Sequence, residues 1–229
     1  MPFALDPPPN IITFDCYGTL VQWDEVLQAA IGDVLATTGR SDLAPQAVLD
    51  HFATIARGLE QSKPHRLYKT VLRDGFAATF ADLGVPARPE DVARVAQSIT
   101  RMGPHPETQA VLRQLRTRYK LAIFTNSDED LIAHNVRLLG VPIDFVITAE
   151  SAQAYKPSRT IFESGHRRLG VTRDEVVHVA MSMDLDIQAC HALGIRGIWI
   201  NRRGLAGNPD WRPYEELPDL RGVPALLGC

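Results

Sequence analysis

Apolar segments that each end in a polar turn are the feature that most constrains the fold of this chain. The clearest is residues 10–14, a short and mostly apolar run that is followed at once by Asp15, Gly18 and Thr19. Short runs of this kind are typical of strands buried in a parallel sheet. Open α/β sheets bind their ligands at the carboxyl ends of such strands. The sequence therefore places Asp15 at a ligand site, where a carboxylate can act as a nucleophile.

The composition is that of an ordinary soluble globular protein. The chain has 229 residues, of which 45% are hydrophobic and 22% charged, so it is long enough for a sizeable core. The net charge of −3 argues against a nucleic-acid partner. No apolar run approaches the ~20 residues that a membrane helix needs. Residues 1–9 lack a basic region and contain three consecutive prolines, so we expect no signal peptide and a cytoplasmic protein.

Helical periodicity dominates the residues that follow the first strand. Four segments carry apolar residues at helical spacing, with no strand between them. They are residues 24–38, 45–59, 68–83 and 89–100. Four consecutive helices after one strand predict a separate helical module, inserted into a domain that is otherwise built on a sheet.

Strands and helices alternate from residue 104 onward. The expected strands are residues 120–125, 145–147, 176–181 and 197–200, and the expected helices are residues 108–118, 131–139, 160–169 and 187–193. This alternation predicts a parallel sheet built from βαβ units. The predicted fold class is α/β, with a Rossmann-like core of residues 1–20 and 104–229 and a helical cap of residues 21–103. Residues 204–217, which are rich in Gly, Pro and Trp, are predicted to form a surface loop.

Polar segments that are distant in sequence converge at one edge of the predicted sheet. They are Asp15, residues 125–127, residues 155–157 and residues 182–186. A carboxylate is a useful nucleophile only when it is ionised and correctly oriented. We expect Lys156 to keep Asp15 ionised by lowering its pKa, while hydroxyl and amide donors fix its orientation.

These segments carry a resemblance to a known family. Asp-x-Tyr-Gly-Thr-Leu at 15–20, Phe-Thr-Asn-Ser at 124–127, Tyr-Lys-Pro at 155–157 and the turn to Asp186 resemble the four ordered motifs of the haloacid dehalogenase superfamily. The resemblance covers the whole chain, and the inserted helices stand where this family has a cap. Tyr17 in place of a second acid, and residues 199–202 after the last strand, resemble its L-2-haloacid dehalogenase branch.

The resemblance implies a hydrolytic dehalogenase. In that reaction the aspartate displaces halide from the carbon next to a carboxylate, and water then cleaves the resulting ester at the aspartyl carbonyl. A halide leaves without a proton, whereas cleavage of a phosphate ester gains from an acid beside the nucleophile, and Tyr17 removes that acid. Met181 stands at the family's usual position for a metal-binding acid, and a thioether is a poor ligand for Mg²⁺. We therefore expect no metal and no organic cofactor.

The resemblance also assigns roles around the nucleophile. Lys156 would pair with Asp15. Thr19, Thr125 and Asn126 would orient Asp15 or bind the substrate carboxylate through hydroxyl and backbone N–H groups. These residues belong to the first three motifs.

The fourth motif supplies the residues for the second step. Asp186 would orient or deprotonate the hydrolytic water, with Ser182 helping to hold it. Asp184 is an alternative for the same role, because a turn after a strand tolerates a small shift in register. Asp184 could instead cap the helix that begins near Leu185, which is a common use of aspartate.

Four further residues are candidates for substrate binding. The family has a cap arginine that stabilises the departing halide, and Arg57 is the nearest candidate, with a solvated surface charge as the alternative. Tyr17 and Trp23 could line an apolar slot for the halogen, although Trp23 could also only pack the cap against the core. Cys16, next to Asp15, is either a reactive thiol at the site or a small buried residue beneath it.

The sequence thus predicts hydrolysis of a small (S)-2-haloalkanoic acid to the (R)-2-hydroxy acid, with the cap closing over the ester. The expected partner is a small halogenated carboxylic acid, with no nucleic acid and no membrane, and the resemblance implies a homodimer. One alternative is a phosphatase of the same superfamily that acts on a small phosphorylated metabolite. Another is a catalytically silent binding protein, against which the retained pair of Asp15 and Lys156 argues.

Overall fold

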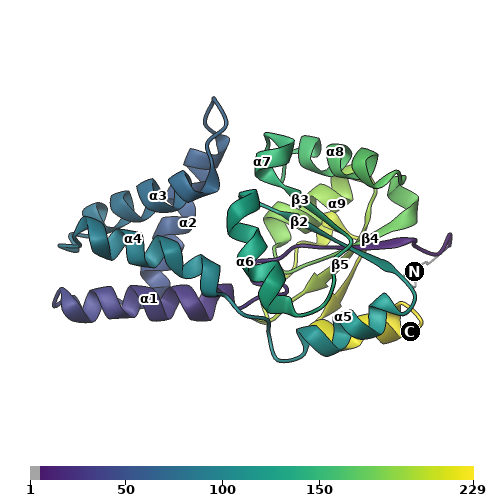
Figure 1. Cartoon of the computed structure of the whole chain (residues 1–229), viewed down its shortest axis with the longest axis horizontal. Coiled ribbons are helices and arrows are strands. Elements are labelled where there is room, and N and C mark those ends of the chain that lie inside the picture. The colour runs from purple at the N-terminus through teal and green to yellow at the C-terminus, as the bar shows by residue number, and fades with distance from the viewer. Residues whose placement is uncertain (1–5) are drawn as a thin grey trace.

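A six-stranded parallel sheet forms the centre of the larger part of the molecule (Figure 1). The structure is a computed structural model and describes residues 6–229. The strand order is β3-β2-β1-β4-β5-β6, and every neighbouring pair is parallel. The strands are β1 Ile11–Phe14, β2 Lys120–Thr125, β3 Phe145–Thr148, β4 Val176–Ala180, β5 Arg196–Ile200 and β6 Tyr214–Leu217. The expectations for the signal peptide and for the start of the core include residues 1–5, which lie outside the described residues.

The position of β1 within the sheet explains where polar residues gather. β1 lies between β2 and β4, and Ile12 pairs with Leu121 on one side and Val177 on the other. Every residue of β1 and β4 is buried, as expected for strands covered on both faces. Because all the strands run in the same direction, their carboxyl ends meet at one edge. Asp15 therefore follows the most enclosed strand of that edge.

Helices cover both faces of the sheet. Apolar residues of α5, α6 and α10 pack with Ile12 and Phe14 on one face, whereas those of α8 and α9 pack with Ile11 on the other. This arrangement confirms the predicted α/β fold class. Within residues 6–229, none of the helices is both long and apolar enough to cross a bilayer. The helices are α5 Thr108–Arg116, α6 Glu129–Leu139, α7 Ala149–Ala152, α8 Arg159–Leu169, α9 Gln188–Leu193 and α10 Val223–Leu226.

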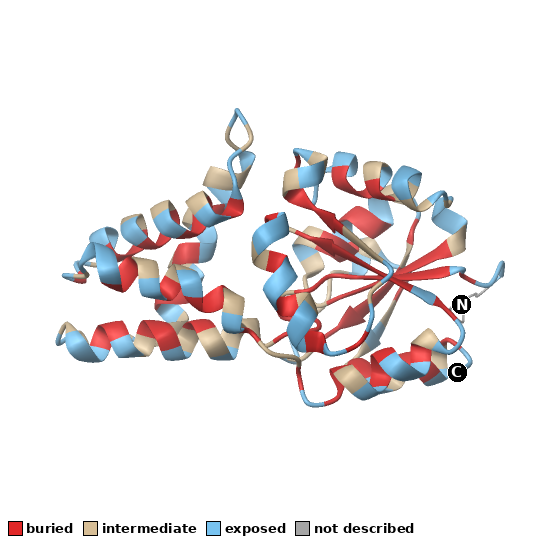
Figure 2. Cartoon of the chain, in the orientation of Figure 1, coloured by how far each residue is buried: buried red, intermediate tan, exposed pale blue. Residues whose placement is uncertain are grey.

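The helices between β1 and β2 form a separate bundle beside the sheet (Figure 1). They are α1 Trp23–Thr37, α2 Pro45–Gln61, α3 Tyr68–Asp82 and α4 Pro89–Gln97. Buried positions alternate with exposed ones along each helix, so each presents an apolar stripe to the bundle interior (Figure 2). The rings of Phe52 and Phe76 stack there with centroids 3.9 Å apart and planes 7° apart. The bundle is the helical cap that the sequence predicts.

Two neighbouring chain segments connect the bundle to the sheet. Val21 and Pro104 form an antiparallel bridge, and the backbone N–H of Gln22 donates to the carbonyl of Gly103 at 2.9 Å. The division of the chain at residues 20/21 and 103/104 stays a prediction. The bridge shows that the segments on both sides of that division lie against each other.

The prediction of a surface loop over residues 204–217 is wrong for its last four residues. Tyr214–Leu217 form β6, which pairs in parallel with β5 at the edge of the sheet. The segment carries two glutamates and follows a proline, so its apolar content is too low to identify a strand from sequence. Edge strands tolerate this composition because one of their two backbone edges stays unpaired and solvated.

A carboxylate from the sheet part caps a helix of the bundle. Asp128 lies between β2 and α6, is fully buried, and accepts hydrogen bonds from the backbone N–H groups of Tyr68 at 2.7 Å and Lys69 at 2.9 Å. These N–H groups begin α3 and have no partner within the helix. The hydroxyl of Tyr155 adds a second link by donating to the carbonyl of Arg66 at 2.7 Å. The start of α3 is therefore fixed against the sheet.

Replacing Asp128 by alanine is expected to lower the free energy of unfolding by about 1–2 kcal/mol, because it removes a helix cap and leaves two donors without a partner. Urea unfolding followed by circular dichroism measures the change. Asp130→Ala is the matched control, since Asp130 is exposed, pairs with Lys69 at the surface and also accepts the adjacent backbone N–H of Leu131, so its loss should cost less than about 0.5 kcal/mol. Equal losses in the two variants would contradict the capping role.

Candidate active site

The polar segments predicted from the sequence meet at the carboxyl ends of β1, β2 and β4. Asp15 follows β1, Asn126 follows β2, and residues 181–186 follow β4. The backbone N–H of Asp15 donates to the carbonyl of Val179 at 3.0 Å, which extends the pairing of β1 with β4 by one residue. Lys156 reaches the same place from the loop between α7 and α8. Parallel topology thus brings together side chains that are up to 171 residues apart (residues 15 and 186) in the chain.

The ammonium group of Lys156 joins two carboxylates. Its Nζ lies 2.7 Å from Oδ1 of Asp15 and 2.8 Å from Oδ1 of Asp186. The Lys156 side chain is 1% exposed and that of Asp186 is 0% exposed. Buried charges of this kind require partners, since their desolvation is otherwise too costly. One cation therefore fixes the positions of two acids from different strands.

Burial and pairing act in opposite directions on these groups. Burial raises the pKa of Asp15, and the nearby Asp186 carboxylate adds to this, while Lys156 and the Thr19 hydroxyl only partly oppose it. Burial also acts to raise the pKa of Asp186, but Lys156 and the His178 hydrogen bond outweigh it and bring that pKa below its ordinary value. Lys156 thus lowers the pKa of Asp15 as expected, but burial exceeds the effect of the ammonium and the net change is an increase.

Thr19 fixes the second oxygen of Asp15. Its hydroxyl donates to Oδ2 of Asp15 at 2.7 Å and accepts from the backbone N–H of Met181 at 2.8 Å. The Thr19 side chain is fully buried. Both oxygens of Asp15 thus have a donor, and the plane of the carboxylate is set.

Asn126 lies in the site, whereas two other predicted residues lie beneath it. The side-chain amide of Asn126 accepts from the backbone N–H of Lys156 at 2.6 Å and donates to its carbonyl at 3.2 Å, so it positions the lysine. Cys16 and Thr125 are fully buried and do not line the active-site cavity. Burial raises the pKa of the Cys16 thiol well above its usual value, which fits the small buried residue rather than a reactive thiol.

Tyr17 occupies the place of a second acid without acting as one. Its hydroxyl donates to Oδ1 of Asn135 at 3.0 Å and lies 3.2 Å from Oγ of Ser127. Burial raises the pKa of the Tyr17 phenol well above its usual range, so the group stays neutral. Its ring lies against Trp23, with centroids 5.4 Å apart. Tyr17 and Trp23 together form an apolar wall of the cavity.

The turn after β4 separates its two acids. Residues Met183–Ile187 form a π-helical turn, and Oγ of Ser182 accepts from the backbone N–H of Leu185 at 3.1 Å. Ser182 is therefore the cap of this turn, and the alternative in which Asp184 caps the helix is wrong. Asp186 points inward to Lys156, whereas the side chain of Asp184 is 58% exposed and lies 3.9 Å from Arg57. Of the two candidates for water activation, only Asp186 lies beside Asp15.

A cavity of about 200 Å³ lies between the sheet edge and the bundle. It is small enough to suit a compact substrate of few heavy atoms. Asp15, Lys156 and Asp186 form its polar floor, and the aromatic side chains form much of its wall. The full lining is Asp15, Tyr17, Trp23, Phe52, Ala53, Ala56, Arg57, Glu60, Tyr68, Asn126, Lys156, Met181, Ser182, Leu185 and Asp186.

The donor set of this cavity does not fit a hard divalent cation. Asp15 and Asp186 both bind the Lys156 ammonium, and Met181, whose thioether is a poor ligand for such a cation, lines the cavity with them. The Met181 side chain packs against Gly18 in the loop after β1, since a Cβ built on Gly18 would lie 2.6 Å from Cε of Met181. In residues 6–229 no cluster of three or more His, Cys, Asp or Glu side chains has the arrangement of a metal site.

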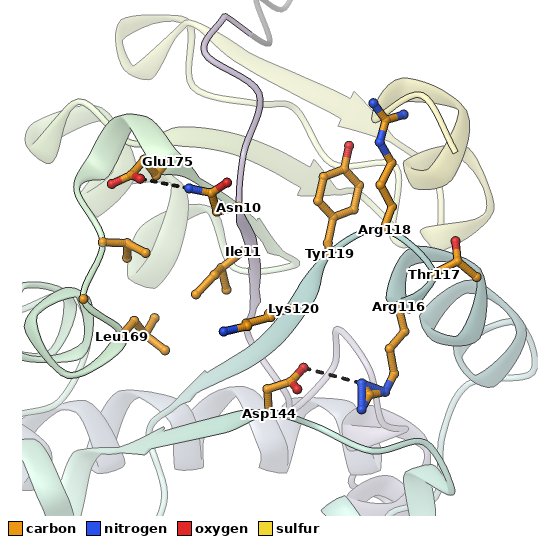
Figure 3. A pocket seen from close by; sticks show the side chains of 12 residues that line it. Asn10, Ile11, Arg116, Thr117, Arg118, Tyr119, Lys120, Asp144, Leu169 and Glu175 are labelled. Atoms are coloured by element: carbon orange, nitrogen blue, oxygen red, sulfur yellow. Dashed lines mark hydrogen bonds and ion pairs between the residues drawn. The ribbon is translucent and has the colours of Figure 1, made fainter.

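A larger cavity of about 630 Å³ lies at the opposite edge of the sheet (Figure 3). It surrounds Ile11 and Lys120, at the amino ends of β1 and β2. Its polar side chains mostly pair with one another, as in the ion pair of Arg116 with Asp144 and the hydrogen bond of Asn10 with Glu175. Neither its position nor these pairs suggest chemistry, so the smaller cavity is the candidate active site.

Glu60, His178 and Thr13 are among the residues of the site that were not predicted from the sequence. Glu60 of α2 lines the cavity, and His178 of β4 and Thr13 of β1 form hydrogen bonds beneath Asp186. A histidine and a threonine inside otherwise apolar strands were the available signal for two of them. Burial raises the pKa of Glu60 to about 7, although Arg57 and Lys156 oppose it. Glu60 is therefore the titratable group of the cavity that changes charge near neutral pH.

Glu60 is expected to make stability depend on pH. Its pKa is about 7 in the folded chain against an ordinary 4.5, so between these values the folded state holds a proton that the unfolded state releases. The stability contributed by this proton is complete below the lower value and is lost as the pH rises through 7. The free energy of unfolding of Glu60→Gln, relative to that of the wild type, should therefore increase by roughly 1–3 kcal/mol as the pH is raised from about 5 to about 8.

Urea unfolding of both proteins at several pH values measures this difference. Glu129→Gln, at an exposed position of α6, is the control for a simple loss of charge. If the free energies of unfolding of the wild type and Glu60→Gln depend on pH in the same way, Glu60 is already charged at pH 5 in the folded chain and the prediction is wrong.

Comparisons with known proteins agree with this geometry. Haloacetate dehalogenase H-2 of Moraxella sp. (strain B) is 35% identical over 116 residues, which are 49% of this chain and 51% of that protein. (S)-2-haloacid dehalogenase H-109 of Pseudomonas putida is 25% identical over 225 residues, or 93% of this chain and 95% of that protein. A phosphoserine phosphatase of Thermus thermophilus is 27% identical over 144 residues, 61% of this chain and 58% of that protein.

Solved structures share the fold. The L-2-haloacid dehalogenase from Xanthobacter autotrophicus with chloropropionic acid covalently bound has a TM-score of 0.81 at 21% identity, over 96% of this chain and 98% of that one. The family model described as haloacid dehalogenase-like hydrolase matches residues 9–194. That range contains Asp15, Lys156 and the turn to Asp186, and it covers most of the chain. The chain therefore belongs to the haloacid dehalogenase-like hydrolases.

Proposed function

We propose that this hydrolase converts small (S)-2-haloalkanoic acids to (R)-2-hydroxy acids through an ester on Asp15, without a metal or an organic cofactor. The observation that carries the proposal is the buried pair of Asp15 and Lys156 on the floor of a 200 Å³ cavity, with Tyr17 in place of an acid beside the nucleophile. The relatives named as dehalogenases support the same reaction.

The first step is displacement at the carbon next to the substrate carboxylate. An oxygen of Asp15 donates an electron pair to that carbon, the carbon–halogen bond breaks, and the halide leaves with the bonding pair. Lys156 and Thr19 hold the two oxygens of Asp15, so the carboxylate is oriented before the substrate binds. No proton is needed, which fits a site where neutral Tyr17 stands in place of an acid beside the nucleophile and the Thr19 hydroxyl already donates to Asp15.

The second step is hydrolysis of the ester at its aspartyl carbonyl carbon. Asp186 lies next to Asp15 through their shared lysine and is the base that takes a proton from water. Ser182 sets the turn that carries Asp186, so its role is to position that acid. The exposed Asp184 does not line the cavity and lies 3.9 Å from Arg57.

Substrate selection follows from the two walls of the cavity. The aromatic rings of Tyr17 and Trp23 provide an apolar slot for the halogen and the alkyl group. Arg57, whose side chain is 50% exposed, provides the cationic group for the departing halide or the carboxylate. The small volume favours short-chain acids.

A phosphatase is the second candidate, favoured by the similarity to the phosphoserine phosphatase. The Met181 thioether and the missing acid beside Asp15 argue against it. Release of phosphate that needs Mg²⁺ and stops with EDTA would establish this candidate in place of the dehalogenase.

Asp15→Asn is expected to lower halide release by more than about a thousandfold, because a neutral amide is a much weaker nucleophile than a carboxylate. A halide electrode measures release from both enantiomers of 2-chloropropionate in the presence of EDTA. The wild type should act on the (S)-enantiomer, and Asp130→Asn, an exposed acid of α6, should match it. Turnover that survives in Asp15→Asn would overturn the proposed nucleophile.

Asp186→Asn and Asp184→Asn are expected to differ in the second step. Without the base, Asp186→Asn should release about one halide per site and then stall with the ester attached to Asp15. Rapid-quench halide assays and the intact mass of the protein detect the burst and the adduct. If Asp184→Asn stalls and Asp186→Asn turns over, the exposed acid is the base instead.

A further inference from the structure

A histidine lies in the middle of a central strand. His178 belongs to β4, is 1% exposed, and lies between Val177 and Val179. Its ring is edge-on to Phe124 and Phe162, with centroids 6.2 Å and 5.5 Å away. A polar ring in such apolar surroundings is costly unless both of its nitrogens have partners.

Both nitrogens of His178 are hydrogen-bonded. Nε2 lies 2.9 Å from Oδ1 of Asp186, and Nδ1 lies 2.8 Å from Oγ1 of Thr13 on the neighbouring strand. Thr13 is the direct partner of His178 in the register of β1 with β4, so the distance is set by the sheet itself. The pair therefore forms wherever the two strands pair correctly.

The Thr13 hydroxyl orients the ring in either protonation state. When His178 is neutral, Thr13 donates to Nδ1, and the hydrogen of the ring is on Nε2. When His178 is charged, Nδ1–H donates to Thr13, whose hydroxyl turns to the carbonyl of Val177 at 3.3 Å. Both arrangements direct an Nε2–H donor at Asp186.

Asp186 is held by one of its two oxygens. Oδ1 accepts from both His178 and Lys156, whereas Oδ2 is buried and has no hydrogen-bond partner in the part of the chain that the structure describes. Asp186 lines the active-site cavity, but His178 does not. His178 cannot touch the substrate and can act only through the acid.

We propose that His178, oriented by Thr13, is a positioning residue that turns the free oxygen of Asp186 toward the water that hydrolyses the Asp15 ester. The inference rests on the proposed function, because it assigns a residue to the second step of that reaction. Lys156 alone would hold Oδ1 but leave the carboxylate free to rotate about that contact. A second donor at the same oxygen, from β4, restricts this rotation.

The step balances with the residues present. Water attacks the carbonyl carbon of the Asp15 ester while Oδ2 of Asp186 takes one of its protons. The bond between that carbon and the ester oxygen then breaks, and the proton on Asp186 passes to the departing oxygen to give the hydroxy acid. The remaining water proton leaves Asp15 for the solvent as its carboxylate reforms, so one proton is released with each halide. His178 keeps its own proton throughout.

Three variants test the inference in a two-step assay. His178→Leu removes the donor to Asp186, His178→Gln places an amide N–H near the position of Nε2, and Thr13→Val removes only the hydroxyl that orients the ring. Rapid-quench halide release from (S)-2-chloropropionate measures the first step, and steady-state turnover with intact mass measures the second. His134→Gln, at an exposed position of α6, is the control.

We expect the halide burst of His178→Leu to stay within about twofold of the wild type while its turnover falls about 10- to 100-fold and the ester accumulates. His178→Gln should recover part of that loss, and Thr13→Val should fall between the wild type and His178→Leu. Equal slowing of both steps in these variants would overturn the inference, since a loss of fold affects both. If His178→Leu does not fold, His178→Gln and Thr13→Val decide the question alone.

The wild type separates this inference from the proposed function. Halide release beyond one equivalent per site establishes the dehalogenase before any variant is compared. A wild type that releases no halide from any chloro-, bromo- or fluoroacid overturns both. A wild type that turns over, with variants that accumulate no ester, overturns only the role of His178.

Discussion

The interaction on which the rest of the site depends is the sharing of one lysine ammonium by two buried carboxylates. Lys156 lies within 2.8 Å of both Asp15 and Asp186. Its removal would leave two buried carboxylates without a cationic partner. The sheet supplies this contact by aligning the ends of β1 and β4, while Asn126 fixes the lysine backbone from β2. The same cation therefore positions both the proposed nucleophile, Asp15, and the proposed base, Asp186.

Much of this arrangement could be predicted because parallel strands leave few places for polar residues. Asp15 and Asp186 lie in turns after apolar runs, and a parallel sheet brings the ends of such runs together. Lys156 comes from the loop between α7 and α8, which lies at the same edge of the sheet. The helices of the bundle could also be predicted, since their apolar spacing is regular, and their observed ends fall within a few residues of the predicted ends. Local sequence patterns are sufficient for prediction where the parallel topology alone brings the residues together.

The remainder depends on distances that no local pattern contains. Thr13 and His178 are 165 residues apart, and their contact becomes meaningful only when the register of β1 with β4 is known. Glu60 belongs to a helix whose orientation toward the sheet is set by packing, so its face could not be assigned. The net direction of the Asp15 pKa likewise depends on the depth of burial, which exceeds what the neighbouring lysine offsets. The edge strand β6 was missed for want of apolar residues.

The attachment of the bundle at two separate places has a consequence for the shape of the cavity. Val21 bridges Pro104 at the chain crossings, and Asp128 and Tyr155 bind the chain at the start of α3. An attachment at a second place resists rotation of the bundle about the first. The aromatic side chains that the bundle contributes, Trp23 and Phe52, therefore have a defined position over the floor at Asp15.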